Sequence, residues 1–126
     1  MSEMIDGRMI KHHNDGHGLN DDLLIYADER LQPMNASHDY DIEIDGSTVA
    51  EIRFQRGPRH EADSRHGVTQ EALLAVVIDR LEGFQAGPFA CEENGVALVK
   101  CQEALAVLRS RADARAKRGV LGRNVR

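Results

Sequence analysis

The sequence predicts an α+β fold, in which a small antiparallel β-sheet precedes a C-terminal antiparallel helical hairpin. Two patterns predict it. Apolar residues alternate with acids in the first half of the chain, as in half-buried strands, and they recur every three or four residues in the second half, as in amphipathic helices. The 126 residues suit one domain or a small domain with an added module. We expect a β region at 1–56, a polar connector at 57–67, and a helical hairpin with a basic glycine-containing end at 68–126.

Three stretches of the first half are typical of strands. Residues 38–55 form the clearest hairpin, with Asp45-Gly46 as its turn, because glycine accepts the positive φ that a tight hairpin needs. Residues 22–29 predict another short strand, and residues 4–10 a smaller hairpin of the same kind. A sheet of so few strands needs a cover on one face.

The second half predicts two helices joined by a two- or three-residue break. Thr69 suits the N-cap of the first helix, Gly87-Pro88 ends it, and Pro88 can take an early position in the second, from about 89 to 117. Helices joined so closely must be antiparallel neighbours. The expected inward positions are Leu74, Val77, Leu81 and Phe84, then Cys91, Asn94, Leu98, Cys101, Leu105, Leu108 and Ala112.

The predicted core is poor in large side chains, since the chain has no Trp, two Tyr and three Phe. A domain of this size buries only about two-thirds of its unfolded surface, so we expect copies to associate into a homo-oligomer. Two cysteines are too few for a disulfide framework, and no apolar run reaches the roughly 18–20 residues that span a membrane. No secretory signal opens the sequence, so we expect an intracellular protein with reduced thiols.

Charge is concentrated at the C-terminal end. The net charge is −5, yet residues 109–126 hold seven cationic side chains against one acid, which leaves −11 for the rest. A compact basic end suits a small, multiply charged anion better than duplex DNA, although the same cations also suit the negative end of a helix dipole. Arg111, Arg115 and Arg118 share one helical face by their spacing. Gly119 and Gly122 would let backbone N–H groups approach an oxyanion.

The segment 11–22 holds His12, His13 and His17 near Asp residues, but its spacing matches no standard zinc or calcium template. A flexible turn is the simplest interpretation, with metal binding and ligand contact left open. Cys91 and Cys101 fall on the inward helical stripe without a His or Asn partner, and no catalytic motif is present. We therefore expect no enzyme activity, metal or cofactor.

Asn94 is the polar exception among the inward positions. A buried amide must be hydrogen-bonded. It either fixes the register of the helices or faces a pocket. Phe84 and Asn94 should both lie within about two turns of the closed end of the hairpin, meaning the end at the Gly87-Pro88 break. An aromatic face beside an amide suits a purine base, through stacking worth about 1–3 kcal/mol and a hydrogen bond to the base edge.

The segments "GVTQEALLAVVIDRLEGFQAGPFACEEN" (67–94) and "ARAKRGVLGR" (114–123) together resemble the helical hairpin shared by two phage immune-evasion families, the type-one Thoeris anti-defence proteins and the type-two anti-CBASS proteins. The segments "HNDGHGLNDDLLIYADER" (13–30) and "NASHDY" (35–40) resemble the Thoeris type in particular. The resemblance covers nearly the whole chain.

This resemblance implies a sponge in the host bacterial cytoplasm, which holds nucleotide second messengers of bacterial defence without cleaving them. The implied ligands are cyclic ADP-ribose isomers, such as glycocyclic ADP-ribose, and cyclic trinucleotides at a separate site. The implied assembly is a homo-oligomer, commonly a hexamer, with ADP-ribose pockets between neighbouring subunits and trinucleotide pockets where three chains meet. No duplex nucleic acid and no membrane is implied as a partner.

The resemblance also implies site residues. In the cyclic ADP-ribose pocket, Phe84 would stack on the base and Asn94 would make a polar contact. The cations assigned to the diphosphate and riboses are Arg30, Arg59 and Arg111. The trinucleotide pocket would use Arg115, Arg118, Gly119, Val120, Leu121, Gly122 and Arg123. The last position departs from the family pattern, in which a Thr follows the second glycine. The Arg123 cation would either strengthen phosphate binding or fill the pocket.

Two other functions remain as alternatives at this stage. One is a phosphodiesterase or glycohydrolase that uses the His and Asp side chains of 12–22. The other is a nucleic-acid-binding regulator that uses the basic helix end. The acidic remainder of the chain makes the second alternative the weaker of the two.

Overall fold

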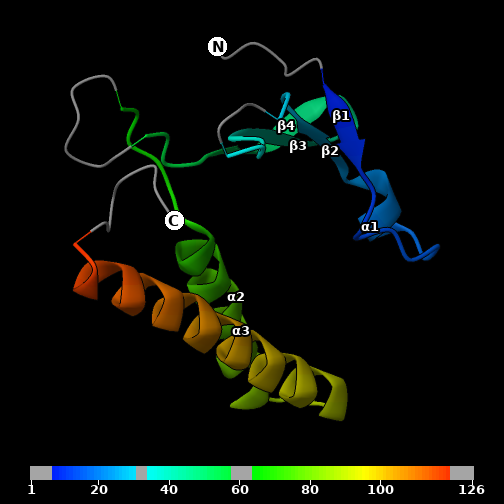
Figure 1. Ribbon diagram of the computed structural model, residues 1–126. Helices are drawn as coiled ribbons and strands as arrows, with labels where there is room; N and C mark the ends of the chain where they lie inside the picture. Colours follow the sequence, from blue (N-terminus) through cyan, green and yellow to red (C-terminus); the bar gives the residue numbers. More distant parts are fainter. Residues whose placement is uncertain (1–6, 31–33, 58–63, 120–126) are drawn as a thin grey trace. The chain divides into compact units, whose positions relative to one another are not determined.

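The computed structural model describes residues 7–30, 34–57 and 64–119, which belong to two compact units, Met1–Gly67 and Val68–Arg126. The first unit carries an antiparallel sheet and the second carries two helices (Figure 1). The predicted α+β class is therefore confirmed.

The sheet is a four-stranded meander in the order β1-β2-β3-β4. Its strands are β1 (Arg8–Ile10), β2 (Leu24–Ala27), β3 (Asp39–Ile44) and β4 (Ser47–Arg53), and the short helix α1 (Leu19–Asp22) lies between β1 and β2. All neighbouring strands are antiparallel.

The hairpin between β3 and β4 is confirmed. Asp45 and Gly46 both adopt positive φ, 50° and 78°, as the tightest two-residue hairpin turn requires. The register shifts next to Ile42, which pairs with Ala50, whereas Glu43 pairs with Thr48. Val49 is thus the extra residue of a β-bulge, which explains why apolar alternation is imperfect along the return strand.

One detail of the predicted strands was wrong, and another falls partly outside the described residues. Of the smaller hairpin expected at 4–10, residues 8–10 form β1, which pairs with β2, and residues 4–6 lie outside the described residues. The strand expected at 22–29 narrows to Leu24–Ala27, because Asp22 is the last residue of α1.

Two of the three acids of β3 are more buried than its apolar residues. Asp41 is 3% exposed and Glu43 7%, and the described residues contain one fully buried hydrophobic side chain, Ala27. Arg53 of β4 forms an ion pair with Asp41, with Nη2 and Oδ1 2.9 Å apart, and the same nitrogen lies 3.1 Å from Glu51. A buried charge is tolerated when it is paired and hydrogen-bonded in this way.

On the hairpin unit, α2 (Gln70–Gln85) and α3 (Glu92–Lys117) pack against each other as antiparallel neighbours (Figure 1). Thr69 is the N-cap of α2, as predicted, and its Oγ1 accepts a hydrogen bond from the Ala72 N–H at 3.1 Å. Half-buried residues follow one stripe of each helix. They include the predicted Leu74, Leu81, Phe84, Asn94, Leu98, Cys101, Leu105, Leu108 and Ala112.

Three predictions for this hairpin need correction. Val77 is 45% exposed, and Ile78 takes its place in the half-buried stripe. Cys91 is exposed, because it is the N-cap of α3 and precedes the first helical turn. The segment that joins α2 to α3 therefore spans residues 86–91, which is longer than expected, and Pro88 lies in it rather than in α3. We refer to this segment, which is distinct from the polar segment 57–67, as the connector.

The hairpin also exposes apolar side chains. Neither helix contains a fully buried residue. Val96, Val99 and Val107 of α3 are all about half exposed or more, and their spacing places them on the face opposite the half-buried stripe. None of the described helices combines the length and apolar character that crossing a membrane requires.

Candidate functional site

The closed end of the hairpin brings together the two residues predicted to bind a base. Phe84 lies in the last turn of α2 and Asn94 in the first turn of α3, and both side chains are half-buried. The chain between them turns sharply. The Gly87 N–H donates to the Phe84 carbonyl at 3.2 Å, and the Ala90 N–H donates to the Gly87 carbonyl at 3.3 Å. A ring and an amide therefore lie at the same end of one compact unit.

The Phe84 ring already has a cationic neighbour. The guanidinium carbon of Arg80 lies 4.9 Å from the ring centroid, one helical turn earlier on α2. This is the geometry of a cation–π contact, which favours a fixed ring orientation. Arg80 is exposed, so its charge also contributes to the field at the closed end.

Gln85 and Cys91 tie the two helices together across the connector. The Gln85 side-chain amide donates from Nε2 to the Cys91 carbonyl and accepts at Oε1 from the Cys91 N–H, each at 3.0 Å. The Cys91 Sγ then accepts from the Asn94 N–H at 3.4 Å. We refer to the two bonds between Gln85 and Cys91 as the Gln85 clamp.

Sequence reasoning missed both Gln85 and Arg80. Gln85 follows Leu81 by four residues and is half-buried, so its position in the apolar stripe was the available signal. Its partner was not predictable, because the bonds join a side chain to the backbone of a residue six positions later. The spacing of Arg80 and Phe84 by four residues was likewise a signal for the cation–π contact.

The basic end of α3 lies at the opposite end of the hairpin. Arg111 and Arg118 are exposed and Arg115 is half-buried. The helix ends at Lys117 with Arg118 as its C-cap, and the next residue, Gly119, turns the chain away with a φ of +73° and donates its N–H to the Ala116 carbonyl at 3.0 Å. The predicted site residues Val120, Leu121, Gly122 and Arg123 lie outside the described residues, as does Arg59.

One chain does not bring Arg111 to the closed end. Asn94 and Arg111 both belong to the continuous helix α3, and the 17 steps from one position to the other correspond to about 25 Å at a rise of 1.5 Å per residue. Arg30 is exposed, three residues after the end of β2, and belongs to the other unit. Of the five residues predicted for the ADP-ribose pocket, the hairpin of a single chain thus gathers Phe84 and Asn94.

The His- and Asp-rich segment is a loop that leads into α1, and hydrogen bonds join its own residues. Asp21 Oδ1 accepts from the N–H groups of Asp15 and Gly16 at 3.0 and 3.1 Å. Asp15 in turn accepts from the Asn20 side-chain amide and the His17 N–H, each at 3.0 Å. The Asn20 bond, followed by the His17 bond, lowers the pKa of the Asp15 carboxyl below its usual value of 3.8.

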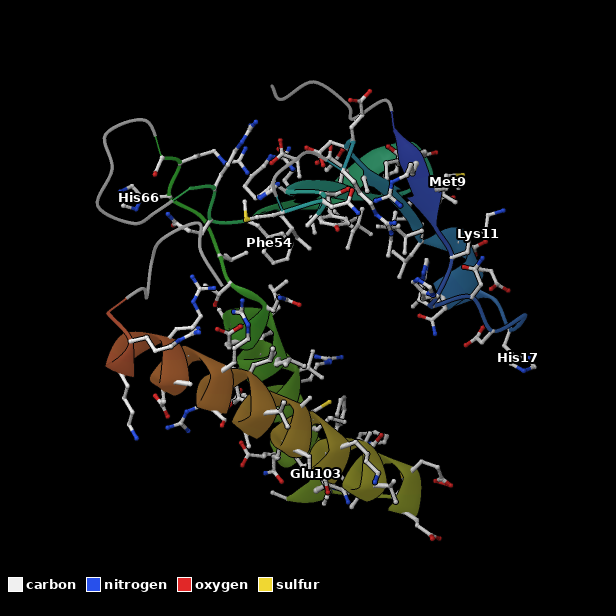
Figure 2. The ribbon with its side chains drawn as sticks, viewed as in Figure 1. Met9, Lys11, His17, Phe54, His66 and Glu103 are labelled. Carbon is white, nitrogen blue, oxygen red and sulfur yellow. The ribbon has the colours of Figure 1, made fainter. Side chains whose placement is uncertain are left out.

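The His17 and His66 side chains do not converge. His17 lies at the tip of the loop, and His66 lies at the far side of the same unit (Figure 2). His13 uses Nε2 to bond the Leu23 carbonyl at 2.6 Å. In the ranges that the structure describes, no three His, Cys, Asp or Glu residues are grouped as metal ligands would be.

Comparison with known proteins places the hairpin in a family. A sequence model of the Acb2/Tad1 hairpin domain matches residues 47–112, which is more than half of the chain and includes Phe84, Asn94 and Arg111. The protein "Thoeris anti-defense 1" of Bacillus phage SBSphiJ7 is 45% identical over 74 residues, which cover 59% of this chain and 51% of the relative. The aligned part of the chain thus spans about half the length of that relative. The chain belongs to the Acb2/Tad1 hairpin family.

Proposed function

We propose that this protein is a phage anti-defence sponge that binds cyclic ADP-ribose isomers, such as glycocyclic ADP-ribose, and holds them uncleaved in the host cytoplasm. The observation that carries the proposal is the pairing of Phe84 with Asn94 at the closed end of the hairpin. The ring offers a stacking surface for adenine and the amide offers a hydrogen bond to its edge. The name of the phage relative supports an anti-defence role.

Binding without cleavage agrees with how the reactive side chains are used. The Cys91 thiol accepts the Asn94 N–H, which makes it part of a helix cap. The carboxylates of Asp15 and Asp21, on which a hydrolase in segment 12–22 would depend, accept hydrogen bonds from their own loop. Capture of a scarce signal requires nanomolar affinity, about −12 kcal/mol, which a preformed pocket with arginine contacts can supply.

We further propose that two copies of the chain complete each pocket. Because Arg111 lies about 25 Å along α3 from Asn94, it can join Phe84 and Asn94 only when a neighbouring copy presents its open end, the end away from the connector. The diphosphate of the ligand carries two negative charges, which guanidinium groups bind through charge-assisted hydrogen bonds. Arg80 lies beside Phe84 in the same chain, and Arg111 of a neighbouring copy would add a second cation. The contributions proposed for Arg30 and Arg59 serve the same charges.

The exposed valines of α3 support self-association. Val96, Val99 and Val107 form an apolar stripe on a helix that has no buried residue in the single chain. A second copy is the occupant we propose, within a homo-oligomer of the hexameric kind that the resemblance implies. Light scattering after size exclusion tests this. Val99→Glu should lower the molar mass of the assembly, and a monomeric unmodified chain would refute the proposal.

A second site for cyclic trinucleotides is proposed at the basic end of α3. Its support is the exposed Arg118 beside Gly119, whose positive φ turns the chain out of the helix. The residues that would complete it, from Val120 to Arg123, follow directly in the sequence. A cyclic trinucleotide should bind without displacing glycocyclic ADP-ribose, and competition between the two ligands in calorimetry would refute separate sites.

The central experiment is capture and release. The purified protein is incubated with glycocyclic ADP-ribose, separated from free ligand, denatured, and the released nucleotide is identified by mass spectrometry. Intact ligand is expected, and a cleaved product would refute the sponge. Phe84→Ala and Asn94→Ala should both reduce capture, whereas Gln102→Ala, which removes an exposed amide from the same helix, should not. Normal capture by both Phe84→Ala and Asn94→Ala would show that Phe84 and Asn94 do not belong to the binding site.

A further inference from the structure

Gln85 connects the last turn of α2 to the residue that caps α3. Both polar atoms of its side-chain amide bond the backbone of one residue, Cys91, at 3.0 Å each. The clamp spans the whole connector, so the two ends of the connector are held directly rather than through the intervening residues. A side chain that satisfies both the N–H and the carbonyl of one distant residue leaves that residue little freedom to shift or rotate.

The clamp reaches Asn94 through Cys91. Cys91 is the N-cap of α3, its Sγ accepts the Asn94 N–H at 3.4 Å, and its carbonyl accepts the Gly95 N–H at 3.2 Å. The Cys91 carbonyl is therefore shared between the first turn of α3 and the Gln85 amide. Phe84 is covalently adjacent to Gln85. The bonds that start at Gln85 thus fix the first turn of α3, and with it Asn94, relative to Phe84.

Gly95 shows how closely the two helix ends approach around this amide. A Cβ at Gly95 would lie 3.1 Å from the Gln85 Nε2, which is tighter than ordinary van der Waals contact. Gly95 is helical and has no positive φ, so a side chain at this position would be opposed by the Gln85 side chain rather than by the backbone conformation.

We propose that Gln85 is a positioning residue for the Phe84–Asn94 pair, and that ligand affinity depends on both hydrogen bonds of the Gln85 clamp. The inference rests on the proposed function, because Phe84 and Asn94 are the residues taken to hold the base. A stacking surface and an amide bind one base tightly only when their separation is set beforehand, since ordering them on binding reduces affinity.

The clamp is first tested without ligand, so that its failure is distinguishable from failure of the proposed function. In Gln85→Ala, the Cys91 N–H loses its acceptor, and we expect its hydrogen exchange by NMR to accelerate at least tenfold, with a shift of the Asn94 side-chain amide resonances. Thr69→Ala, which removes the cap at the open end of α2, is the matched control and should leave both signals unchanged. Unchanged signals in Gln85→Ala would overturn the inference whether or not the protein binds nucleotide.

Calorimetry with glycocyclic ADP-ribose then tests the effect on binding. Gln85→Ala should bind glycocyclic ADP-ribose at least tenfold more weakly than the unmodified chain. Thr69→Ala should change the affinity less than twofold, even if the two variants have the same melting temperature. Equal weakening in both variants would reduce the role of Gln85 to general stability and overturn the proposal. Absence of binding by the unmodified chain would overturn the proposed function, and with it the positioning role of Gln85. The hydrogen-exchange measurement on Cys91 would still show whether the Gln85 clamp forms.

Gln85→Glu distinguishes positioning from packing, because it keeps the size of the side chain. A carboxylate can accept from the Cys91 N–H but repels the Cys91 carbonyl, whereas a protonated carboxyl restores the donor. The affinity of Gln85→Glu relative to the unmodified chain should therefore rise as pH falls through the Glu pKa, ordinarily about 4.3. A ratio that does not change with pH would overturn the requirement for both bonds.

Discussion

Phe84 and Arg111 should complement each other between subunits. The test uses two single variants, Phe84→Ala and Arg111→Ala. Each is purified alone, and the two are also co-expressed, with a different affinity tag on each variant. Alone, each variant should capture little glycocyclic ADP-ribose, because every pocket lacks one of its groups. The structure places Arg111 about 25 Å along α3 from the closed end of its own hairpin, too far for one small ligand to contact both.

The expected recovery follows from this separation. If one copy supplies Phe84 and its neighbour supplies Arg111, random mixing of equal amounts leaves about one quarter of the pockets with both native residues. If one copy supplied both, no pocket would be restored. Co-expression of the Phe84→Ala/Arg111→Ala double variant with the unmodified chain gives the complementary test. Shared pockets predict about one quarter intact sites, and single-chain pockets predict about one half.

The assay is the stoichiometry of ligand released from assemblies that carry both tags. Purification through both tags excludes assemblies of one variant, and calorimetry reports the fraction of active sites as the binding stoichiometry. Because the selection enriches mixed assemblies, the quarter is a lower bound for recovery. Mixed assemblies that capture no more ligand than the single variants would refute a pocket built from two copies.

Three further predictions concern local structure. Thr69→Ala should lower the free energy of unfolding of the hairpin by about 1 kcal/mol in chemical denaturation, because it removes the bond to the Ala72 N–H, and an unchanged midpoint would contradict the cap. Gly119→Ala should lower the free energy of unfolding by about 1–2 kcal/mol, because alanine is disfavoured at a φ of +73° and a Cβ there contacts nothing within 4 Å. Gly83→Ala is the control, since Gly83 has equal space but no positive φ, and it should not lower the free energy of unfolding. Asn20→Ala should raise the pKa of Asp15 toward 3.8 in an NMR titration, because the Asn20 amide is the main cause of its lowering. Because the pKa of Asp15 is lowered, its ionised carboxylate stabilises the folded loop above pH 3.8, and this contribution is lost as pH falls through the lowered pKa. A pKa of Asp15 that does not change in Asn20→Ala would contradict the assigned cause.

Sequence pattern predicted the elements that depend on local chemistry. Asp45-Gly46 and Thr69 were identified because a positive φ and a helix cap need particular residue types at particular positions. Cys91 was misplaced because it continues the three/four spacing of α3 by chance, while its sulfur acts as a cap. The short helix α1 was not expected, because four residues carry no detectable periodicity.

The parts of the site differ in predictability for the same reason. Phe84 and Asn94 lie near each other along the chain around a turn, so their proximity follows from a helical hairpin alone. The Gln85 clamp depends on the path of the connector, which turned out longer than expected. The buried Asp41 and Glu43 were not predicted, because alternation does not show which face of a sheet becomes buried. Asp41 is paired there with Arg53, a partner on another strand.

Stability and ligand binding should depend on the same assembly. The hairpin has no buried residue in the single chain, and two isolated helices gain too little from their shared stripe to be stable in water. Covering the valine stripe of α3 with another copy adds burial, and on the proposed arrangement it also brings an arginine to the closed end. A substitution in that stripe, such as Val99→Glu, should therefore weaken ligand capture although Val99 is not one of the residues proposed to contact the ligand. Saturating glycocyclic ADP-ribose should partly restore the assembly, because a ligand held between two copies stabilises their contact by mass action.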